Sequence, residues 1–109
     1  MKEEKKLAAL LQTLGVENRL SIIAYIGAES KSVGEISKQL GLSQPLVSHH
    51  LKTMRENQIL VTERRGAFIY YRLKNERLLE VLGALSEIAR LLRDESAKKG
   101  PFCCPSWWR

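Results

Sequence analysis

The chain lacks features that define several common classes of protein. Only two of its 109 residues are cysteine, too few for a framework of disulfide bonds. No apolar run approaches the ~20 residues that span a membrane. Residues 1–6 are charged and are not followed by the apolar run of a secretory signal. We therefore expect a cytoplasmic protein that does not enter a membrane.

Catalytic motifs are absent from the sequence as well. It contains no Ser/His/Asp arrangement, no glycine-rich phosphate loop, no clustered pair of acids and no Cys-x-x-Cys motif, so an enzyme is not expected. Lysine and arginine outnumber the acids by 18 to 12, and the net charge of +6 favours a polyanionic partner. The length allows one domain, which we expect over residues 1–97, with a C-terminal tail over 98–109.

The most informative segment is 43–54, which has the pattern of a helix that reads DNA. Ser43 is a favourable N-cap, and Pro45 falls in the first turn, where its missing N–H costs nothing. One apolar stripe recurs at helical spacing and can face a core: Val47, Leu51 and Met54. The opposite side carries residues suited to the base edges of a major groove: Gln44, Pro45, Ser48, His49 and Lys52. A merely solvated face would carry more glutamate and lysine.

A second helix is predicted directly before this one, over residues 33–40. Ser32 and Glu35 have the S-x-x-E spacing of a capping box, in which each side chain accepts a hydrogen bond from the other's backbone N–H. Gly41 follows at the place where a left-handed residue ends a helix. Two short helices joined in this way form a helix-turn-helix, although an ordinary helical hairpin has the same spacing.

A β-hairpin is predicted after the recognition helix. Residues 60–65 and 68–73 are rich in β-branched and aromatic side chains, and the Gly-Ala pair at 66–67 suits a type II′ turn. Arg64 and Arg65 stand at the tip of this wing, where they could reach phosphates or a minor groove. The alternative is a solvated turn with incidental charge.

Three further helices are predicted, over residues 3–14, 17–28 and about 75–97. Apolar residues of the last one spread over more than half of its circumference, which is wider than a single core requires. The first helix adds Leu7, Leu10, Leu11 and Leu14. We therefore expect a homodimer formed through the first and last helices. Its recognition helices would meet successive major grooves, about 34 Å apart, on a pseudo-palindromic double-stranded operator.

In the order of its elements and in several motifs, the chain resembles the ArsR/SmtB family of winged helix-turn-helix repressors. The resemblance covers roughly residues 5–95 and is carried by 14–23 (LGVENRLSII), 33–40 (VGEISKQL), 42–52 (LSQPLVSHHLK) and 66–73 (GAFIYYRL). It implies a mainly α fold with a small β-hairpin wing (α+β) and a homodimer that leaves its operator when a metal or metalloid ion binds. The DNA contacts implied by position are Ser43, Gln44, Pro45, Ser48, His49, Lys52, Arg64 and Arg65.

The inducer sites best known in this family are not matched by the sequence. Its arsenic-sensing members carry Cys-x-Cys in the helix before the recognition helix, and residues 33–40 contain no cysteine. Its zinc-sensing members use histidine and acidic residues on the last helix, and residues 75–97 contain no histidine. His49 and His50 have no further ligand at metal-binding spacing, and we expect His50 to pack at the edge of the buried stripe.

The only cysteines, Cys103 and Cys104, are adjacent in the tail. Soft thiolates favour As(III), Sb(III) or another thiophilic ion as inducer, and no cofactor is otherwise required. A three-thiolate site would need one more thiol from the partner subunit or from solution, whereas a methylated arsenical needs only two. The pair could instead sense redox or sulfur species, or pack passively with the aromatic residues of the tail.

Capture of a ligand by this pair is expected to reposition the tail against the last helix and so change the separation of the recognition helices. DNA affinity would then fall by the coupling free energy. Two alternatives remain for the function as a whole. A winged helix can serve as a protein-interaction module without DNA, and a repressor can act without an inducer. A steep dependence of duplex binding on salt would exclude the first of these.

Overall fold

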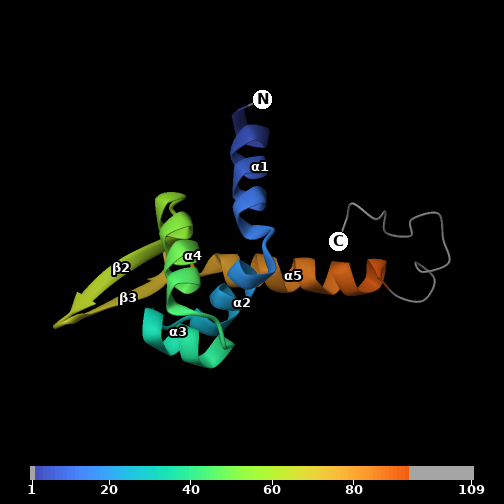
Figure 1. Cartoon of the computed structure of the whole chain (residues 1–109). Helices are drawn as coiled ribbons and strands as arrows, with labels where there is room; N and C mark the ends of the chain where they lie inside the picture. The colour runs from blue at the N-terminus through green and yellow to red at the C-terminus, as the bar shows by residue number, and fades with distance from the viewer. Residues whose placement is uncertain (1, 94–109) are drawn as a thin grey trace. The chain divides into compact units, whose positions relative to one another are not determined.

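The computed structural model describes residues 2–93 (Figure 1). These residues form five helices and a three-stranded antiparallel sheet, which confirms the predicted mainly α fold with a hairpin wing. One compact unit ends at Leu79, and α5 from Glu80 onward belongs to a second. The elements are α1 (Lys2–Leu14), α2 (Glu17–Ile26), β1 (Lys31–Ser32), α3 (Val33–Leu40), α4 (Gln44–Glu56), β2 (Leu60–Arg65), β3 (Phe68–Leu73) and α5 (Arg77–Leu92).

The core of the first unit joins the helices to the base of the hairpin. In it α2 packs on α3 and α4, and α4 also packs on α3 and β2. Burial of one such apolar side chain stabilises the fold by about 1.5–3 kcal/mol. The predicted apolar stripe of the recognition helix lies in this core, so α4 is held along its length. The core side chains are Leu14, Ile22, Ile23, Ile26, Ile36, Val47, Leu51, Met54, Ile59, Leu60 and Leu73.

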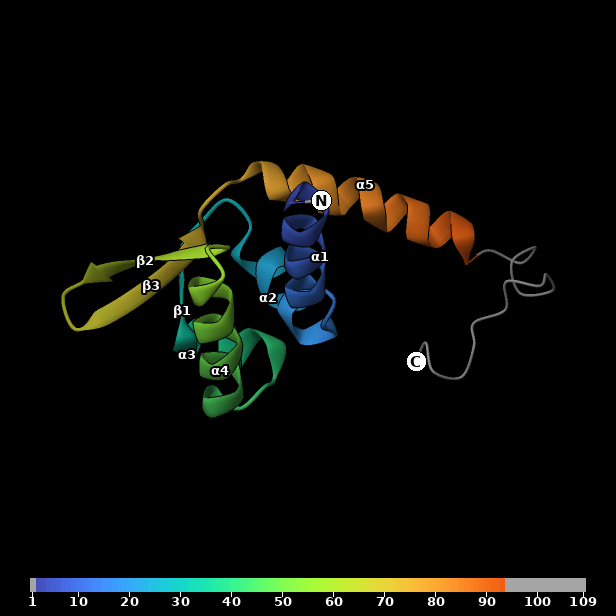
Figure 2. The ribbon, with the colours of Figure 1, turned by 90° about the horizontal axis from the view of Figure 1, so that it is seen from above.

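The hairpin of β2 and β3 has the strands and the turn that the sequence predicts. Its register runs from the pair Leu60 and Leu73 at the base to the pair Arg65 and Phe68 at the tip. Gly66 has a φ of 62°, whereas Ala67 does not have a positive φ, which fits the first and second central positions of a type II′ turn. In both views the hairpin projects away from helices α1 to α4 of the same unit (Figures 1 and 2).

The short strand β1 is an addition that the sequence does not predict. Lys31 pairs with Tyr71 and Ser32 with Tyr70, so β1 joins the sheet on the β3 side and the strand order is β1-β3-β2. It is two residues long, too short to show an alternating pattern. Its effect is to attach the start of α3 to the wing.

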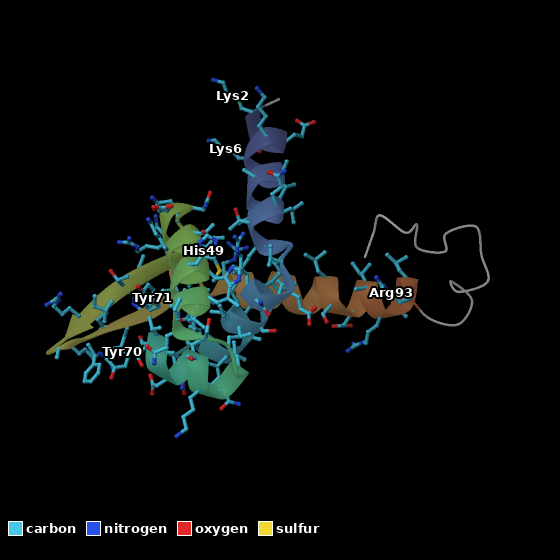
Figure 3. The ribbon with its side chains drawn as sticks, viewed as in Figure 1. Lys2, Lys6, His49, Tyr70, Tyr71 and Arg93 are labelled. Atoms are coloured by element: carbon cyan, nitrogen blue, oxygen red, sulfur yellow. The ribbon has the colours of Figure 1, made fainter. Side chains whose placement is uncertain are left out.

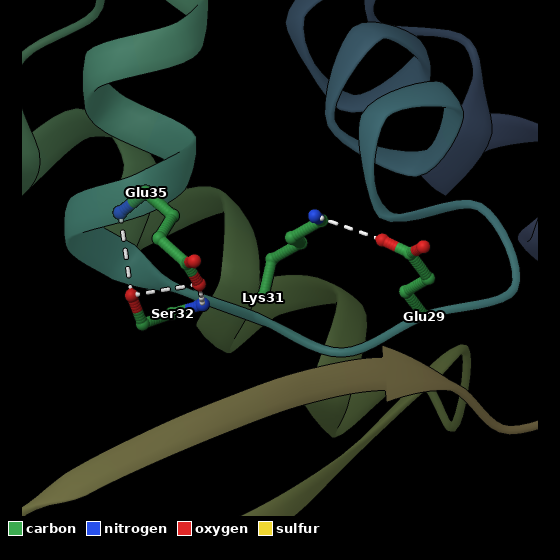
Figure 4. A network of polar contacts seen from close by, with 4 residues as sticks. All are labelled: Glu29, Lys31, Ser32 and Glu35. Carbon is green, nitrogen blue, oxygen red and sulfur yellow. Dashed lines mark hydrogen bonds and ion pairs between the residues drawn. The ribbon is translucent and has the colours of Figure 1, made fainter.

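The start of α3 is fixed by the predicted capping box (Figure 4). Glu35 Oε1 accepts a hydrogen bond from the Ser32 backbone N–H at 2.9 Å, and the Glu35 N–H donates to Ser32 Oγ at 3.3 Å. The bond from the Ser32 N–H lowers the pKa of Glu35 below its ordinary value. Beside it, Lys31 Nζ lies 2.9 Å from Glu29 Oε1, and this carboxylate raises the pKa of Lys31. Local contacts thus hold the entry to the helix-turn-helix.

Three predicted helix ends differ from the structure. The second helix ends at Ile26, because Gly27 adopts a φ of 54° and caps it. The recognition helix continues to Glu56. The last helix begins at Arg77 and not at Asn75, because Asn75 Oδ1 accepts a hydrogen bond from the Arg77 N–H at 2.9 Å. The predicted end near residue 97 lies outside the described residues.

Both α1 and α5 carry large apolar side chains that are exposed. In α1, Leu7 is 54% and Leu11 47% exposed, one helical turn apart. No residue of α5 is buried. Its exposed apolar residues are Val81, Leu85, Ile88, Leu91 and Leu92, and most of them fall on one stripe. No helix in the described part of the chain has the length and apolar character that crossing a membrane demands.

Candidate nucleic-acid interface

The turn between α3 and α4 sets the direction in which the recognition helix leaves. Gly41 ends α3 in the left-handed conformation, with φ 67° and ψ 30°. The backbone N–H groups of Gly41 and Leu42 both donate to the Ser37 carbonyl, at 2.9 and 3.2 Å. The Ser37 hydroxyl in turn donates to the Leu42 carbonyl. Because these bonds close the turn on both sides, the angle between α3 and α4 is tightly defined.

The recognition helix begins where the sequence predicts. Ser43 has extended backbone angles, and its Oγ accepts a hydrogen bond from the Leu46 N–H at 3.3 Å. The hydroxyl proton of Ser43 is not used by this cap, so Ser43 can cap the helix and still donate to a phosphate. Unused backbone N–H groups at a helix N-terminus also favour an anion. The start of α4 therefore suits contact with the DNA backbone.

One side of α4 faces solvent and carries every residue that we predict to contact DNA from this helix. His49 is labelled on α4 in Figure 3. The opposite side is buried and consists of Val47, His50, Leu51 and Met54. We call the exposed set the recognition face: Ser43, Gln44, Pro45, Ser48, His49 and Lys52. The structure thus brings these six residues together on one surface, with hydrogen-bonding groups and one lysine.

The two arginines of the wing are both exposed but lie on opposite faces of the hairpin. Arg64 is on the face that carries the buried Leu60, which is the side toward the core. Arg65 is on the other face, where its Nε and Nη2 donate to the Glu63 carboxylate, both at 3.3 Å. Its guanidinium carbon also lies 4.7 Å from the centre of the Tyr70 ring. The side chain of Arg65 is therefore held against the hairpin by Glu63 and Tyr70, whereas that of Arg64 makes no such contact among the described residues.

A polar contact behind the recognition face joins three helices. Arg19 of α2 donates from Nε to Nδ1 of His50 at 3.1 Å and from Nη1 to the Thr13 carbonyl at the end of α1, at 3.0 Å. His50 is 7% exposed, which confirms that it is packed at the edge of the core. Burial lowers the pKa of His50 below its ordinary value, and the charges of Arg19 and His49 lower it further. We call Arg19, His50 and the Thr13 carbonyl the joint.

The sequence does not reveal the joint. Arg19 and His50 are 31 residues apart, and neither position has a local pattern that indicates a partner. The engagement of Arg65 by Glu63 and Tyr70 is missed for a similar reason, because it depends on the register of the hairpin. The two-residue spacing from Glu63 to Arg65 is the only signal that could have indicated this contact.

Residues 2–93 contain no group of three or more His, Cys, Asp or Glu side chains that could hold a metal ion. The predicted inducer residues, Cys103 and Cys104, lie outside the described part of the chain. The described residues therefore support a DNA-binding surface, and the inducer site stays a prediction from the sequence.

Comparison with known proteins gives the same assignment as the geometry. Residues 17–60 match the family described as "Bacterial regulatory protein, arsR family". The biofilm growth-associated repressor of Xylella fastidiosa is 34% identical over 87 residues, which cover 80% of this chain and 76% of that protein. The crystal structure of NolR from Sinorhizobium fredii is 33% identical, with a TM-score of 0.72, and the match covers 80% of this chain and 87% of that one.

A further structural neighbour supports the fold alone. It is a homodimeric winged helix-turn-helix DNA-binding domain from Mycobacterium bovis, with a TM-score of 0.76, 18% identity, and coverage of 85% of this chain and 86% of that one. The relatives are transcriptional regulators, which confirms that an enzyme is not to be expected. The chain belongs to the ArsR/SmtB family of winged helix-turn-helix, DNA-binding transcriptional regulators.

Proposed function

We propose that this protein is a homodimeric repressor that binds a pseudo-palindromic operator and is released by a thiophilic ion at Cys103 and Cys104. The observation that carries the DNA-binding part is the recognition face, which stands on a helix anchored by its whole opposite side. The relative from Xylella fastidiosa is named a repressor, which supports repression as the direction of control.

The side chains of the recognition face divide into two roles by their chemistry. Gln44, Ser48 and His49 carry donors and acceptors that can read base edges in a major groove. Lys52 and the two wing arginines carry fixed positive charge that neutralises phosphates. Because neutralising phosphates releases bound counterions, DNA affinity falls as the salt concentration rises. The logarithm of the binding constant falls linearly with the logarithm of the salt concentration, with a slope of about −0.9 for each phosphate contacted on duplex DNA. These contacts therefore give both sequence preference and a measurable dependence on salt.

The dimeric state rests on the exposed apolar residues of α1 and α5. Leu7 and Leu11 on α1, and the stripe of α5 that includes Leu85, present apolar surface of a kind that monomeric proteins seldom leave in water. A second copy of the chain is a partner that can cover each of these surfaces. The neighbour from Mycobacterium bovis is itself described as homodimeric, which is consistent with this assembly.

The inducer site is proposed on the thiols of Cys103 and Cys104. They are the only cysteines of the chain, and adjacent thiolates bind soft ions such as As(III) or Sb(III) in preference to hard ones. A third sulfur ligand would come from the partner subunit or from a small thiol in solution. Binding would lower operator affinity through the long last helix, to which the tail is joined.

The proposed function is tested with the reduced full-length protein and a duplex that it enriches from a random pool. Fluorescence anisotropy over a salt series gives affinity and slope, and arsenite is then titrated into the complex. We expect tight, salt-dependent binding that arsenite reverses. The same titration on Cys103→Ser with Cys104→Ser should leave the complex intact, whereas Ser106→Ala, a change in the same tail that keeps both thiols, should respond normally.

A response to oxidants is the second candidate, favoured by the adjacency of the two cysteines. Two thiols in sequence can form a disulfide within one chain or between subunits without a metal. The same complex is therefore titrated with hydrogen peroxide and with a polysulfide. Release by either reagent, but not by arsenite, would assign the cysteines to redox or sulfur sensing. If duplex binding is absent or does not change with salt, the protein does not contact phosphates. This result would contradict both the ion-released and the oxidant-released repressor and would favour a protein-interaction module.

A further inference from the structure

The joint connects the helix that reads DNA to the end of α1 through one side chain, that of Arg19. One guanidinium makes both contacts, at 3.1 Å to His50 Nδ1 and at 3.0 Å to the Thr13 carbonyl. Thr13 and His50 are 8% and 7% exposed, so both ends of the connection are buried. In the proposed dimer α1 contributes to the subunit interface, and the joint then connects that interface to α4.

The contact fixes the protonation state of His50. Arg19 Nε is a donor and cannot accept, so Nδ1 must present a lone pair and the ring proton must be on Nε2. A second proton on Nδ1 would place N–H against N–H at this distance and a positive ring beside the Arg19 charge. The other charged group acting on the ring is His49 of α4, and it too opposes a positive charge.

We propose that Arg19 and His50 are positioning residues that hold the recognition helix to the end of α1, and that a proton taken up at His50 Nδ1 opens the joint and weakens DNA binding. His50 directly follows His49 and lies two residues after Ser48, so the joint is attached to the part of α4 that carries the recognition face. The inference rests on the proposed function, because it concerns the affinity of this face for DNA.

The sign of the pH effect follows from the direction of the pKa shift. The folded protein favours the neutral ring, because burial and the nearby charges disfavour the imidazolium form. The stabilisation from the joint is therefore complete above the ordinary histidine pKa of about 6.5. It is lost as the pH falls through the lower pKa of the folded state. Operator affinity is therefore expected to fall as the pH falls.

Two substitutions of His50 distinguish its role as the hydrogen-bond acceptor of Arg19 from its ability to take up a proton. In His50→Asn the amide oxygen takes the place of Nδ1, so the acceptor is kept and no proton can bind. In His50→Gln the amide reaches the place of Nε2, and the acceptor for Arg19 is lost. His49 is present in both variants and in the wild type, so the three proteins differ only at position 50.

Anisotropy with the selected duplex is measured for the three proteins between about pH 8 and about pH 5, a window that extends well below the ordinary histidine pKa. We expect wild-type affinity to fall about threefold to tenfold further than that of His50→Asn. His50→Gln should bind more weakly than His50→Asn at every pH. Adding Arg19→Gln to His50→Gln also removes the bond to the Thr13 carbonyl, but it should weaken DNA binding little further, because the connection from α1 to α4 is already broken when the bond from Arg19 to His50 is lost.

Ring ¹⁵N shifts of His50, measured without DNA, provide a second test. The Nε2–H tautomer at neutral pH, and titration below that of an ordinary histidine, are the expected results. The proposal is overturned if the pH response of His50→Asn equals that of the wild type, or if the proton is found on Nδ1. Failure of the wild type to bind duplex DNA at any pH would instead overturn the proposed function, and with it the DNA-binding part of this inference.

Discussion

We predict that Glu63→Gln increases operator affinity by releasing Arg65. In the free protein Arg65 makes two hydrogen bonds of 3.3 Å to the Glu63 carboxylate, and it must give these up to contact a phosphate. The side chains are 54% and 44% exposed, and exposed ion pairs of this kind contribute about 0.2–1 kcal/mol. The dissociation constant should therefore fall by up to about fivefold for each wing that contacts DNA.

The assay is anisotropy with the selected duplex at low salt, where the effect is largest. Glu76→Gln removes an exposed acid outside the hairpin and serves as the matched control for net charge. Glu63→Gln is also made in an Arg65→Ala background, where only the direct repulsion between Glu63 and phosphate remains. Equal gains in the two backgrounds, or a gain no larger than that of Glu76→Gln, would refute the competition between Glu63 and DNA for Arg65.

Two further predictions concern the turn and the proposed dimer. Gly41→Ala should lower the free energy of unfolding by about 1–2 kcal/mol in a urea titration, because Gly41 has a φ of 67°; Gly34→Ala, at ordinary φ within α3, should not destabilise. Leu85→Glu places a charge among the exposed apolar residues of α5, where Leu85 is 43% exposed, and should convert the dimer to monomer in sedimentation equilibrium. Ser86→Glu, the adjacent position, should not, and a monomeric wild type would contradict the assembly itself.

The parts of the fold that sequence predicts are those that depend on neighbouring residues. The capping box of Ser32 and Glu35, the left-handed Gly41 and the N-cap Ser43 are all local signals, and each is found where the sequence places it. The exposed recognition face follows from the same helical spacing, because Val47, Leu51 and Met54 must be buried together and the other side is left to solvent.

The parts that sequence misses depend on contacts between distant segments. The strand β1 exists because β3 offers it a partner, and two residues carry no pattern of their own. His50 is predicted to be packed, but its bond to Arg19 depends on how α2 and α4 meet. The engagement of Arg65 similarly depends on the hairpin register, which brings Tyr70 beside it.

The turn closed by Ser37 and Gly41 bears on how quickly this protein can search a chromosome. Its hydrogen bonds are already made before DNA arrives, so α4 has little backbone left to order on contact. Encounters are then limited by diffusion and by the attraction of cations to phosphate, with no folding step in between. A reading helix that is rigid in advance can sample one sequence after another and abandon each mismatch at little cost.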